Sequence, residues 1–209
     1  MSDARLAVLA SGSGTNLQAL IDATSSDPDF GGRIVVVGSD QHDAGALGRA
    51  RDAGIPTVAE ALGDHPDRPT WEKALADAVA EHRPDIVVLA GFMKLVSGDF
   101  LNRWPNNVVN THPSLLPGLR GAHAVRDALE HGVKVTGCTV HLVDEHVDHG
   151  PIIAQRAVDV RPDDTEESLH ERIKAVEHVL LPACVKLLCH DRIRLEGRVV
   201  RITSDNEES

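Results

Sequence analysis

The sequence predicts an α/β fold built on a doubly wound, mostly parallel sheet, with antiparallel strands toward the C-terminus. Short apolar runs rich in Val, Ile and Leu fit strands that are buried on both faces of a parallel sheet. Segments with helical periodicity alternate with these runs at least four times, as in consecutive βαβ units. A glycine-rich turn, residues 11–16, separates the first apolar run from the first helix.

Each element is assigned from its own residues, in chain order. The expected strands occupy residues 5–10, 33–39, 57–59, 86–90 and 106–110, and then 135–142 and 152–158. The expected helices occupy residues 17–23, 45–53, 71–81 and 124–131, and a long helix covers 164–189. Pro182 is expected to bend or break that last helix, because proline removes a backbone donor. The strands at 135–142 and 152–158 have no helix between them, so we expect them to be antiparallel, and residues 194–202 to form a small strand pair.

Composition and charge restrict the function. The 209 residues suit one domain, which we assign to residues 1–203, with residues 204–209 as a frayed acidic tail. A net charge of -11 and an aromatic content of 2% argue against a nucleic-acid partner or an anionic membrane. No apolar run could span a bilayer, and three cysteines without paired spacing indicate reduced thiols. We therefore expect a cytoplasmic protein, a monomer or homodimer, that acts on small molecules.

The most informative stretch is residues 110–117, Asn-Thr-His-Pro-Ser-Leu-Leu-Pro. Residues two apart in an extended segment project from the same face, so Asn110 and His112 are expected to point the same way. They supply an amide donor and a group that titrates near neutrality, on a loop stiffened by Pro113 and Pro117. Such a pair suits a site where negative charge develops on an oxygen. A turn asparagine and a hydrogen-bonded histidine are the alternative.

Two further segments have the position of ligand-binding loops. The turn at residues 11–16, Ser-Gly-Ser-Gly-Thr-Asn, could hold a phosphate on backbone N–H groups at a helix N-terminus. It is neither a Walker loop nor a full Gly-x-Gly-x-x-Gly, and a tight turn that needs glycine for its dihedral angles is the alternative. Residues 91–96 follow a buried strand at the edge where open α/β sheets bind ligands, although core packing would explain the same residues.

Four stretches, residues 11–17, 88–93, 110–117 and 143–151, together carry a resemblance to one family. The run Asn-x-His-Pro-Ser-Leu-Leu-Pro resembles the active-site stretch of the folate-dependent formyltransferases. The resemblance covers nearly the whole chain, and it is strongest to the enzymes that formylate glycinamide ribonucleotide in purine biosynthesis. It implies a Rossmann-like formyltransferase fold, 10-formyltetrahydrofolate as co-substrate, and no metal.

The resemblance also implies a role for individual residues. The implied catalytic residues are Asn110, His112 and Asp148. The implied ligands of glycinamide ribonucleotide are Gly12, Ser13, Gly14, Thr15, Asn16 and Glu177. The implied ligands of 10-formyltetrahydrofolate are Arg68, Met93, Lys94, Leu95, Val96, Asn110 and Asp144. In the implied mechanism the amine attacks the formyl carbon directly, an amide and an imidazolium stabilise the oxyanion, and a carboxylate assists. Without the family, Glu177 reads as a solvated helix carboxylate and Asp148 as a turn aspartate.

Two features depart from the family pattern, and two other functions compete with it. Leu119 and Arg120 stand where the family often has an aromatic residue and proline before the glycine, here Gly121, and His149 is an unusual neighbour for Asp148.

A metal-dependent hydrolase could use His141, His146, His149, Asp144 and Asp148 to bind zinc, although their spacing is not a standard motif. A non-catalytic nucleotide-binding module is the other alternative, but it would have no use for the three implied catalytic residues together.

Overall fold

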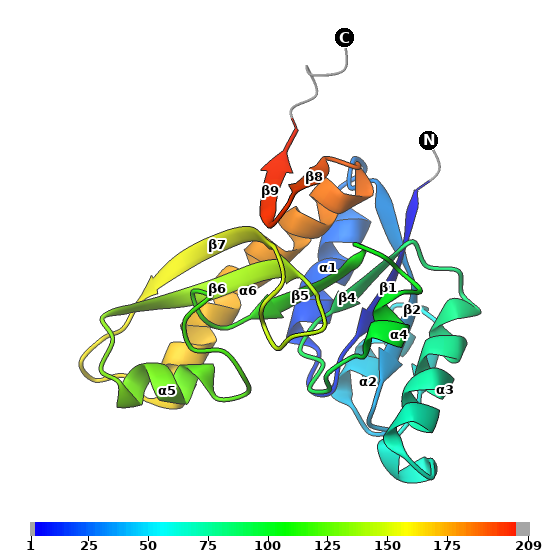
Figure 1. The fold of residues 1–209 in the computed structure, drawn as a ribbon, viewed down its shortest axis with the longest axis horizontal. Coiled ribbons are helices and arrows are strands. Elements are labelled where there is room, and N and C mark those ends of the chain that lie inside the picture. The colour runs from blue at the N-terminus through cyan, green and yellow to red at the C-terminus, as the bar shows by residue number, and fades with distance from the viewer. Residues whose placement is uncertain (1–2, 204–209) are drawn as a thin grey trace.

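The computed structural model describes residues 3–203, so the expected acidic tail at 204–209 lies outside the described residues. Its centre is a seven-stranded sheet with the order β3-β2-β1-β4-β5-β6-β7 (Figure 1). The strands are β1 (Ala4–Leu9), β2 (Gly32–Ser39), β3 (Thr57–Ala59), β4 (Ile86–Leu89), β5 (Val108–His112), β6 (Val135–Leu142) and β7 (Ile152–Asp159). The first five pair in parallel, while β6 and β7 are antiparallel to their neighbours. The predicted mostly parallel sheet with antiparallel late strands is confirmed.

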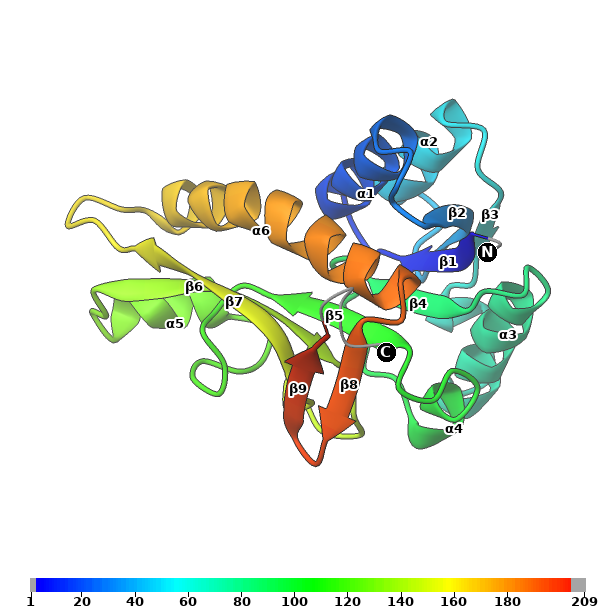
Figure 2. The same ribbon diagram turned by 90° about the horizontal axis from the view of Figure 1, so that it is seen from above.

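Helices cover both faces of the sheet, as a doubly wound fold requires (Figure 2). The helices are α1 (Thr15–Ser26), α2 (Gly45–Asp52), α3 (Arg68–Ala80), α4 (Gly98–Leu101), α5 (Ala124–Glu130) and α6 (Glu166–Cys189), with a 3-10 turn, η1, at Leu62–Asp64. Alternate residues of β1 enter the two cores: Leu6 and Val8 pack beneath α1, α2 and α6, and Ala7 and Leu9 pack beneath α3. This alternation explains why the parallel strands are apolar throughout.

The structure corrects two details of the predicted elements. β5 continues past Asn110 to His112, because its last residues pair with β6, with Asn110 opposite His141 and His112 opposite Thr139. Of the bend or break expected at Pro182, the break is wrong, because α6 is one helix of 24 residues. Proline costs one backbone hydrogen bond, but the residues around it, Leu181 and Val185 among them, are buried against the sheet, and this packing holds the helix together.

The C-terminal part of the described chain forms a separate two-stranded hairpin, β8 (Ile193–Glu196) and β9 (Val199–Ile202). The strand pair expected at 194–202 is therefore confirmed. The hairpin lies across the same side of the molecule as β7 (Figures 1 and 2). Within residues 3–203, none of the helices combines the length and the apolar composition that crossing a bilayer requires.

Candidate active site

A cleft of about 270 Å³ opens at the C-terminal ends of β4 and β5. Its walls come from five parts of the chain that are distant in the sequence: residues within 89–96, 110–113, 121–125 and 141–148, and Glu166 and His170 at the start of α6. The strand order reverses between β1 and β4, next to this cleft. Open α/β sheets bind ligands at such a point, outside the carboxyl ends of the strands.

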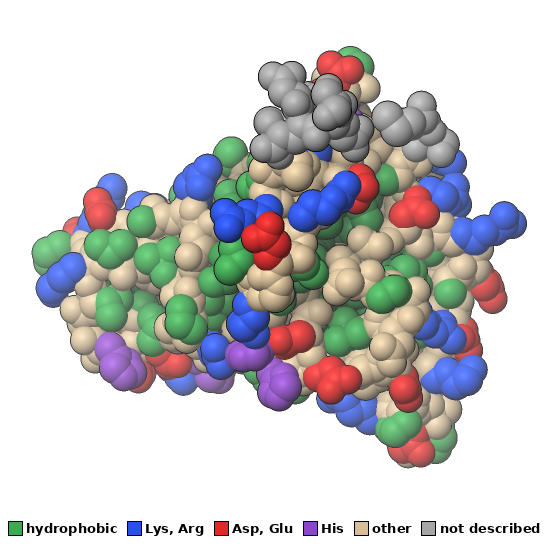
Figure 3. All heavy atoms as spheres, turned by 45° about the horizontal axis from the view of Figure 1, so that its top comes forward, with side chains coloured by type: hydrophobic (Ala, Val, Ile, Leu, Met, Phe, Trp, Pro, Cys, Tyr) green, Lys and Arg blue, Asp and Glu red, His purple; other side chains and the backbone are tan. Residues whose placement is uncertain are grey.

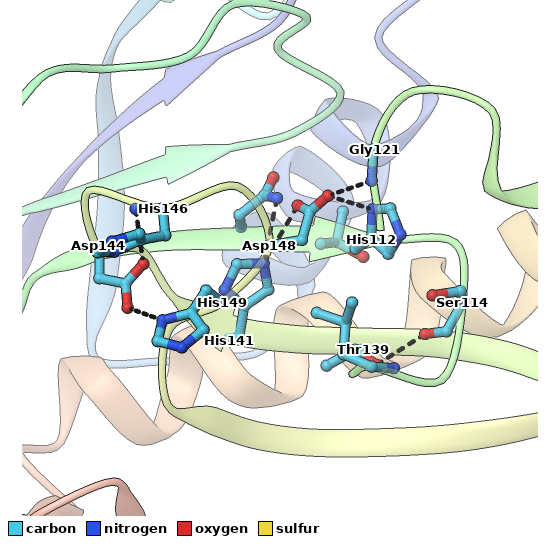
Figure 4. Close-up of polar contacts among 12 residues, drawn as sticks. His112, Ser114, Gly121, Thr139, His141, Asp144, His146, Asp148 and His149 are labelled. Carbon is cyan, nitrogen blue, oxygen red and sulfur yellow. Dashed lines mark hydrogen bonds and ion pairs between the residues drawn. The ribbon is translucent and has the colours of Figure 1, made fainter. Parts of the chain in front are cut away.

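Asn110 and His112 lie on the same face of β5 and both line the cleft. His112 is buried, and its two ring nitrogens face different partners (Figure 4). Nε2 donates a hydrogen bond of 2.8 Å to the carbonyl oxygen of Leu119. Nδ1 lies 3.4 Å from Oδ2 of Asp148. The imidazole is therefore held in a fixed orientation between a backbone carbonyl and a carboxylate.

Asp148 reaches His112 from the loop between β6 and β7. Its backbone has φ +46°, a left-handed conformation that aspartate tolerates better than most residues. Oδ2 also accepts a hydrogen bond of 2.8 Å from the backbone N–H of Gly121. Two residues later, a Cβ at Gly150 would lie 1.8 Å from the carbonyl oxygen of Leu142, so only glycine fits this turn. The structure thus brings together the three residues that the sequence implicated in catalysis.

The loop after His112 is held by side-chain hydrogen bonds rather than by regular structure. The Ser114 hydroxyl donates to the Gly118 carbonyl at 2.7 Å, and the Thr139 hydroxyl donates to the Ser114 carbonyl at 2.7 Å. Thr139 accepts in turn from the backbone N–H of Leu116. These bonds tie residues 113–118 to β6 and support the position of the Leu119 carbonyl.

His141 completes the polar cluster, although its sequence context pointed only to a possible metal ligand. Nδ1 donates to the Leu142 carbonyl at 2.9 Å, so Nε2 is free to accept from the Asn110 amide nitrogen, 3.3 Å away. Burial lowers the pKa of His141, although a backbone hydrogen bond and Asp148 oppose the shift. A histidine in an otherwise uncharged strand was the signal that could have drawn attention to it.

The glycine-rich turn leads into the N-terminus of α1, as predicted. Gly14 has φ +74°, and a Cβ there would lie 2.7 Å from the Cα of Ala46 in α2. The Gly12 carbonyl accepts from the Ala46 N–H at 3.0 Å, and the Ser13 carbonyl accepts from Arg49 at 2.8 Å. The carbonyls of this turn are thus bonded to α2. Thr15 and Asn16 form the first turn of α1.

Glu177 connects this turn to the cleft. It is buried, not solvated, and accepts a hydrogen bond of 2.8 Å from the Thr111 hydroxyl, between Asn110 and His112. Burial raises the pKa of Glu177, while hydrogen bonds from Thr111 and Asn16 oppose the shift. The Oδ1 atom of Asn16 is buried and has no hydrogen-bond partner among the described residues. An unpaired buried acceptor and a buried carboxylate suit a ligand that brings its own hydroxyl donors.

The residues implied to bind folate divide into two groups. Met93, Lys94, Leu95, Val96 and Asp144 line the cleft with Asn110. Met93 and Leu95 are 69% and 58% exposed, an unusual state for large apolar side chains at the rim of a cleft. Arg68 does not line the cleft: it donates to the Leu95 carbonyl at 2.6 Å and borders a separate hollow with Glu72 and Ser97.

Three residues of the 143–151 loop could approach a metal ion. Ligand atoms of Asp144, His146 and His149 lie within 4.8 Å of one another. Oδ2 of Asp144 accepts from Nδ1 of His149 at 2.6 Å, so a metal would have to replace this hydrogen bond. His141 and Asp148, the other members of the zinc set considered from the sequence, are not in this group.

Comparison with known proteins shows the family to which the chain is similar. The sequence profile of the formyl transferase family matches residues 4–185. A phosphoribosylglycinamide formyltransferase of Mycobacterium tuberculosis is 48% identical over 195 residues, which cover 93% of this chain and 89% of that protein. The crystal structure of glycinamide ribonucleotide transformylase 1 from Symbiobacterium toebii superposes with a TM-score of 0.94 at 48% identity, covering 97% of this chain and 95% of that one.

A human relative has a different organisation. The trifunctional purine biosynthetic protein adenosine-3 is 45% identical over 192 residues, but this chain spans only 19% of its length. The doubly wound sheet, and the polar cleft at the ends of its strands, are those of an α/β enzyme with a Rossmann-like fold. Within that class, the chain belongs to the formyl transferase family.

Proposed function

We propose that this chain transfers a formyl group from 10-formyltetrahydrofolate to the amine of glycinamide ribonucleotide, in purine biosynthesis. The observation that carries the proposal is the meeting of Asn110, His112 and Asp148 in one cleft beside a glycine-rich turn. The names of the M. tuberculosis and S. toebii relatives support this choice of substrate.

The chemistry of formyl transfer explains why the cleft has these groups. When an amine attacks a formyl carbon, negative charge develops on the formyl oxygen before the bond to the donor nitrogen breaks. The Asn110 amide nitrogen has two hydrogens, and one is directed to His141, which leaves the other for the oxyanion. The imidazole of His112 lies on the same face of β5 and would add positive charge beside the oxyanion as an imidazolium.

Asp148 has two roles in this proposal. Its Oδ2 atom lies 3.4 Å from Nδ1 of His112, so it fixes the orientation of the imidazole and can pair with the ring as an ion pair. The attacking amine must also lose a proton, and Asp148 can accept it through an intervening water. The Gly121 N–H fixes the carboxylate for both tasks. None of these steps requires a covalent intermediate with the protein.

The two substrates would occupy neighbouring regions. The backbone N–H groups of Gly14, Thr15 and Asn16, shaped by Gly12 and Ser13, would hold the ribonucleotide phosphate at the N-terminus of α1. Glu177 would bind the ribose hydroxyls. The folate would lie along residues 93–96 and Asp144, where exposed apolar side chains can cover a flat ring. Arg68 would contribute to folate binding indirectly, by holding the 93–96 segment through its hydrogen bond to the Leu95 carbonyl. We also propose that residues 1–203 act as one domain.

The direct test mixes 10-formyltetrahydrofolate with glycinamide ribonucleotide and follows formyl transfer. We expect Asn110→Ala, His112→Ala and Asp148→Ala each to lower kcat about 10²–10⁴-fold, with a much smaller change in ribonucleotide binding. His131→Ala, at an exposed histidine that follows α5, serves as the matched control. Losses that arise from binding alone would contradict the assigned roles, and transfer only to water would indicate a hydrolase.

A further inference from the structure

The C-terminal hairpin contacts the loop that carries Asp148, although it lies outside the residues matched by the family profile, 4–185. Its tight turn is formed by Gly197 and Arg198, between the paired residues Glu196 and Val199. The guanidinium of Arg198 donates through Nη2 to the carbonyl oxygen of His149, the residue next to Asp148. Histidine side chains lie beside basic and acidic side chains on this face of the molecule (Figure 3).

Arg198 also adds positive charge beside Asp144, which stands near the other end of the same loop. Nη1 lies 4.0 Å from Oδ2 of Asp144. That oxygen accepts from His149 at 2.6 Å, and Oδ1 accepts from the backbone N–H of His146 at 3.0 Å. Burial acts to raise the pKa of Asp144, but these two hydrogen bonds outweigh it and the pKa is lowered. Arg198 thus contacts the loop near both of its ends, at Asp144 and at His149.

We propose that Arg198 is a positioning residue that holds the 143–151 loop where Asp148 can face His112. The proposal rests on the function proposed above, because it assigns Arg198 a place in that reaction. The loop has little regular structure of its own, and Asp148 has a left-handed backbone that its surroundings must maintain. Because Arg198 holds the carbonyl of His149, the next residue, it restricts the direction of the Asp148 side chain.

If Arg198 only stabilised the fold, its removal would lower the melting temperature. If it positions the loop, its removal would lower kcat without that change. The side chain is 59% exposed, and exposed ion pairs contribute little to stability. Removing the guanidinium is therefore expected to leave the fold unchanged and to release the loop alone. Arg201, on the same hairpin, pairs with Glu196 at 3.0 Å and is also exposed, so Arg201→Met is a matched control.

The experiment compares Arg198→Met, Arg198→Lys and Arg201→Met. We expect Arg198→Met to lower kcat about tenfold, with the KM for glycinamide ribonucleotide and the melting temperature unchanged, and Arg198→Lys to recover part of the loss. In an Asp148→Asn background, Arg198→Met should change kcat less than about twofold, because Arg198 acts through Asp148. Independent losses in the double variant, or the same loss in Arg201→Met, would overturn the proposal.

A second readout does not depend on the reaction. Amide hydrogen exchange across residues 144–150 should accelerate in Arg198→Met and remain at the wild-type rate in Arg201→Met. Unchanged exchange in Arg198→Met would refute the proposal that Arg198 holds the 143–151 loop, even if kcat falls as expected. If the wild-type protein fails to formylate glycinamide ribonucleotide while the exchange result holds, the proposed function is wrong and Arg198 still orders the loop.

Discussion

The amide nitrogen of Asn110 lies 3.3 Å from Nε2 of His141, the residue directly opposite it on β6. Because Nδ1 of His141 donates to a backbone carbonyl, Nε2 can accept this hydrogen bond only while the ring is neutral. Burial lowers the pKa of His141 and so preserves the neutral ring at acidic pH. The orientation of the Asn110 amide therefore depends on the protonation of a second residue of the cleft.

We predict that removing the acceptor at position 141 damages turnover more than binding. His141→Phe should lower kcat about 10–100-fold, less than the loss of an oxyanion donor itself, with the KM for glycinamide ribonucleotide within about twofold. His141→Gln keeps a neutral acceptor and should recover part of the rate. Steady-state kinetics from pH 5 to 8 is the measurement.

The pH profile supplies the control for this prediction. A lowered pKa means that protonation of His141, which breaks the bond from Asn110, occurs only below the usual range of histidine. The wild-type enzyme should therefore lose kcat on the acidic side as His141 becomes charged. His141→Gln should lack this component of the loss. If kcat falls equally at low pH in the wild-type enzyme and in His141→Gln, another group is responsible for the loss.

Glu177 is expected to improve binding at a cost in stability. Its pKa is raised in the fold by burial, so the folded state favours the protonated acid. The stability that this preference contributes is present below the ordinary pKa of glutamate and is lost as pH rises through the raised value. Glu177→Gln should therefore raise the melting temperature relative to wild type at pH 8, and much less at pH 4.5.

The same variant should bind the ribonucleotide poorly. Hydrogen bonds to a charged group are strong, so Glu177→Gln is expected to raise the KM for glycinamide ribonucleotide at least about tenfold. Melting curves at the two pH values, together with kinetics at pH 8, measure both effects. A variant that is less stable at pH 8 and binds normally would show that Glu177 supports the fold and not the substrate.

Much of the fold was predictable because it depends on local patterns. The apolar run of β1 and the glycine at position 14 specify a buried strand and a tight turn without reference to the rest of the chain. Pro182 misled the prediction, because the packing of α6 on the sheet outweighs one missing hydrogen bond. Arg68 faces the Leu95 carbonyl instead of the cleft, and nothing in its local sequence predicted that side-chain direction.

The site itself was predictable only in part, for a related reason. The resemblance named Asn110, His112 and Asp148, and the structure brings them together. The contacts that orient them join distant parts of the chain, such as the pairing of Asn110 with His141 and the bond from Gly121 to Asp148. Strand register and loop conformation determine these contacts, and neither can be read from residue spacing.

Gly121 offers a test of how accurately Asp148 must be placed. It has φ +92°, where any other residue is strained, although a Cβ would find open space. We predict that Gly121→Ala lowers stability by about 1 kcal/mol and shifts the N–H that binds Asp148, lowering kcat about tenfold. Gly132→Ala is the matched control, because Gly132 also has positive φ and open space but lies beyond α5. Equal kinetics in the two variants would contradict the prediction.

Metal removal distinguishes formyl transfer from the metal-dependent hydrolase. The group formed by Asp144, His146 and His149 is the feature that favours a metal. Because the proposed mechanism uses only Asn110, His112 and Asp148, dialysis against a chelator should leave the rate of formyl transfer unchanged. His146→Ala should also retain most of the activity. Stoichiometric zinc in the purified protein, with activity that disappears on chelation and returns with zinc, would favour the hydrolase.

The ammonium of Lys94 lies 3.4 Å from Oδ2 of Asp40, the residue that follows β2. Asp40 is 1% exposed, and its Oδ1 has no hydrogen-bond partner among the described residues. Its Oδ2 also accepts from the side-chain amide of Gln41 at 3.2 Å, but Lys94 supplies the counter-charge. Lys94→Met should destabilise the fold by about 1–3 kcal/mol, because it leaves a buried carboxylate without its counter-charge. The exposed pair of Lys73 with Asp77 is the control, and Lys73→Met should cost less than about 1 kcal/mol.

The same ion pair should also affect the part of the cleft that is proposed to bind folate, because it ties the 93–96 segment to the sheet. Lys94→Met is therefore expected to raise the KM for 10-formyltetrahydrofolate several-fold, while the KM for glycinamide ribonucleotide stays within about twofold. Adding Asp40→Asn removes the unpaired charge and should restore much of the stability but not the folate affinity, since the tether is still absent. Chemical denaturation and steady-state kinetics on the single and double variants separate the two effects. Recovery of both properties in the double variant would mean that Lys94 acts on folate binding only through the stability of the fold.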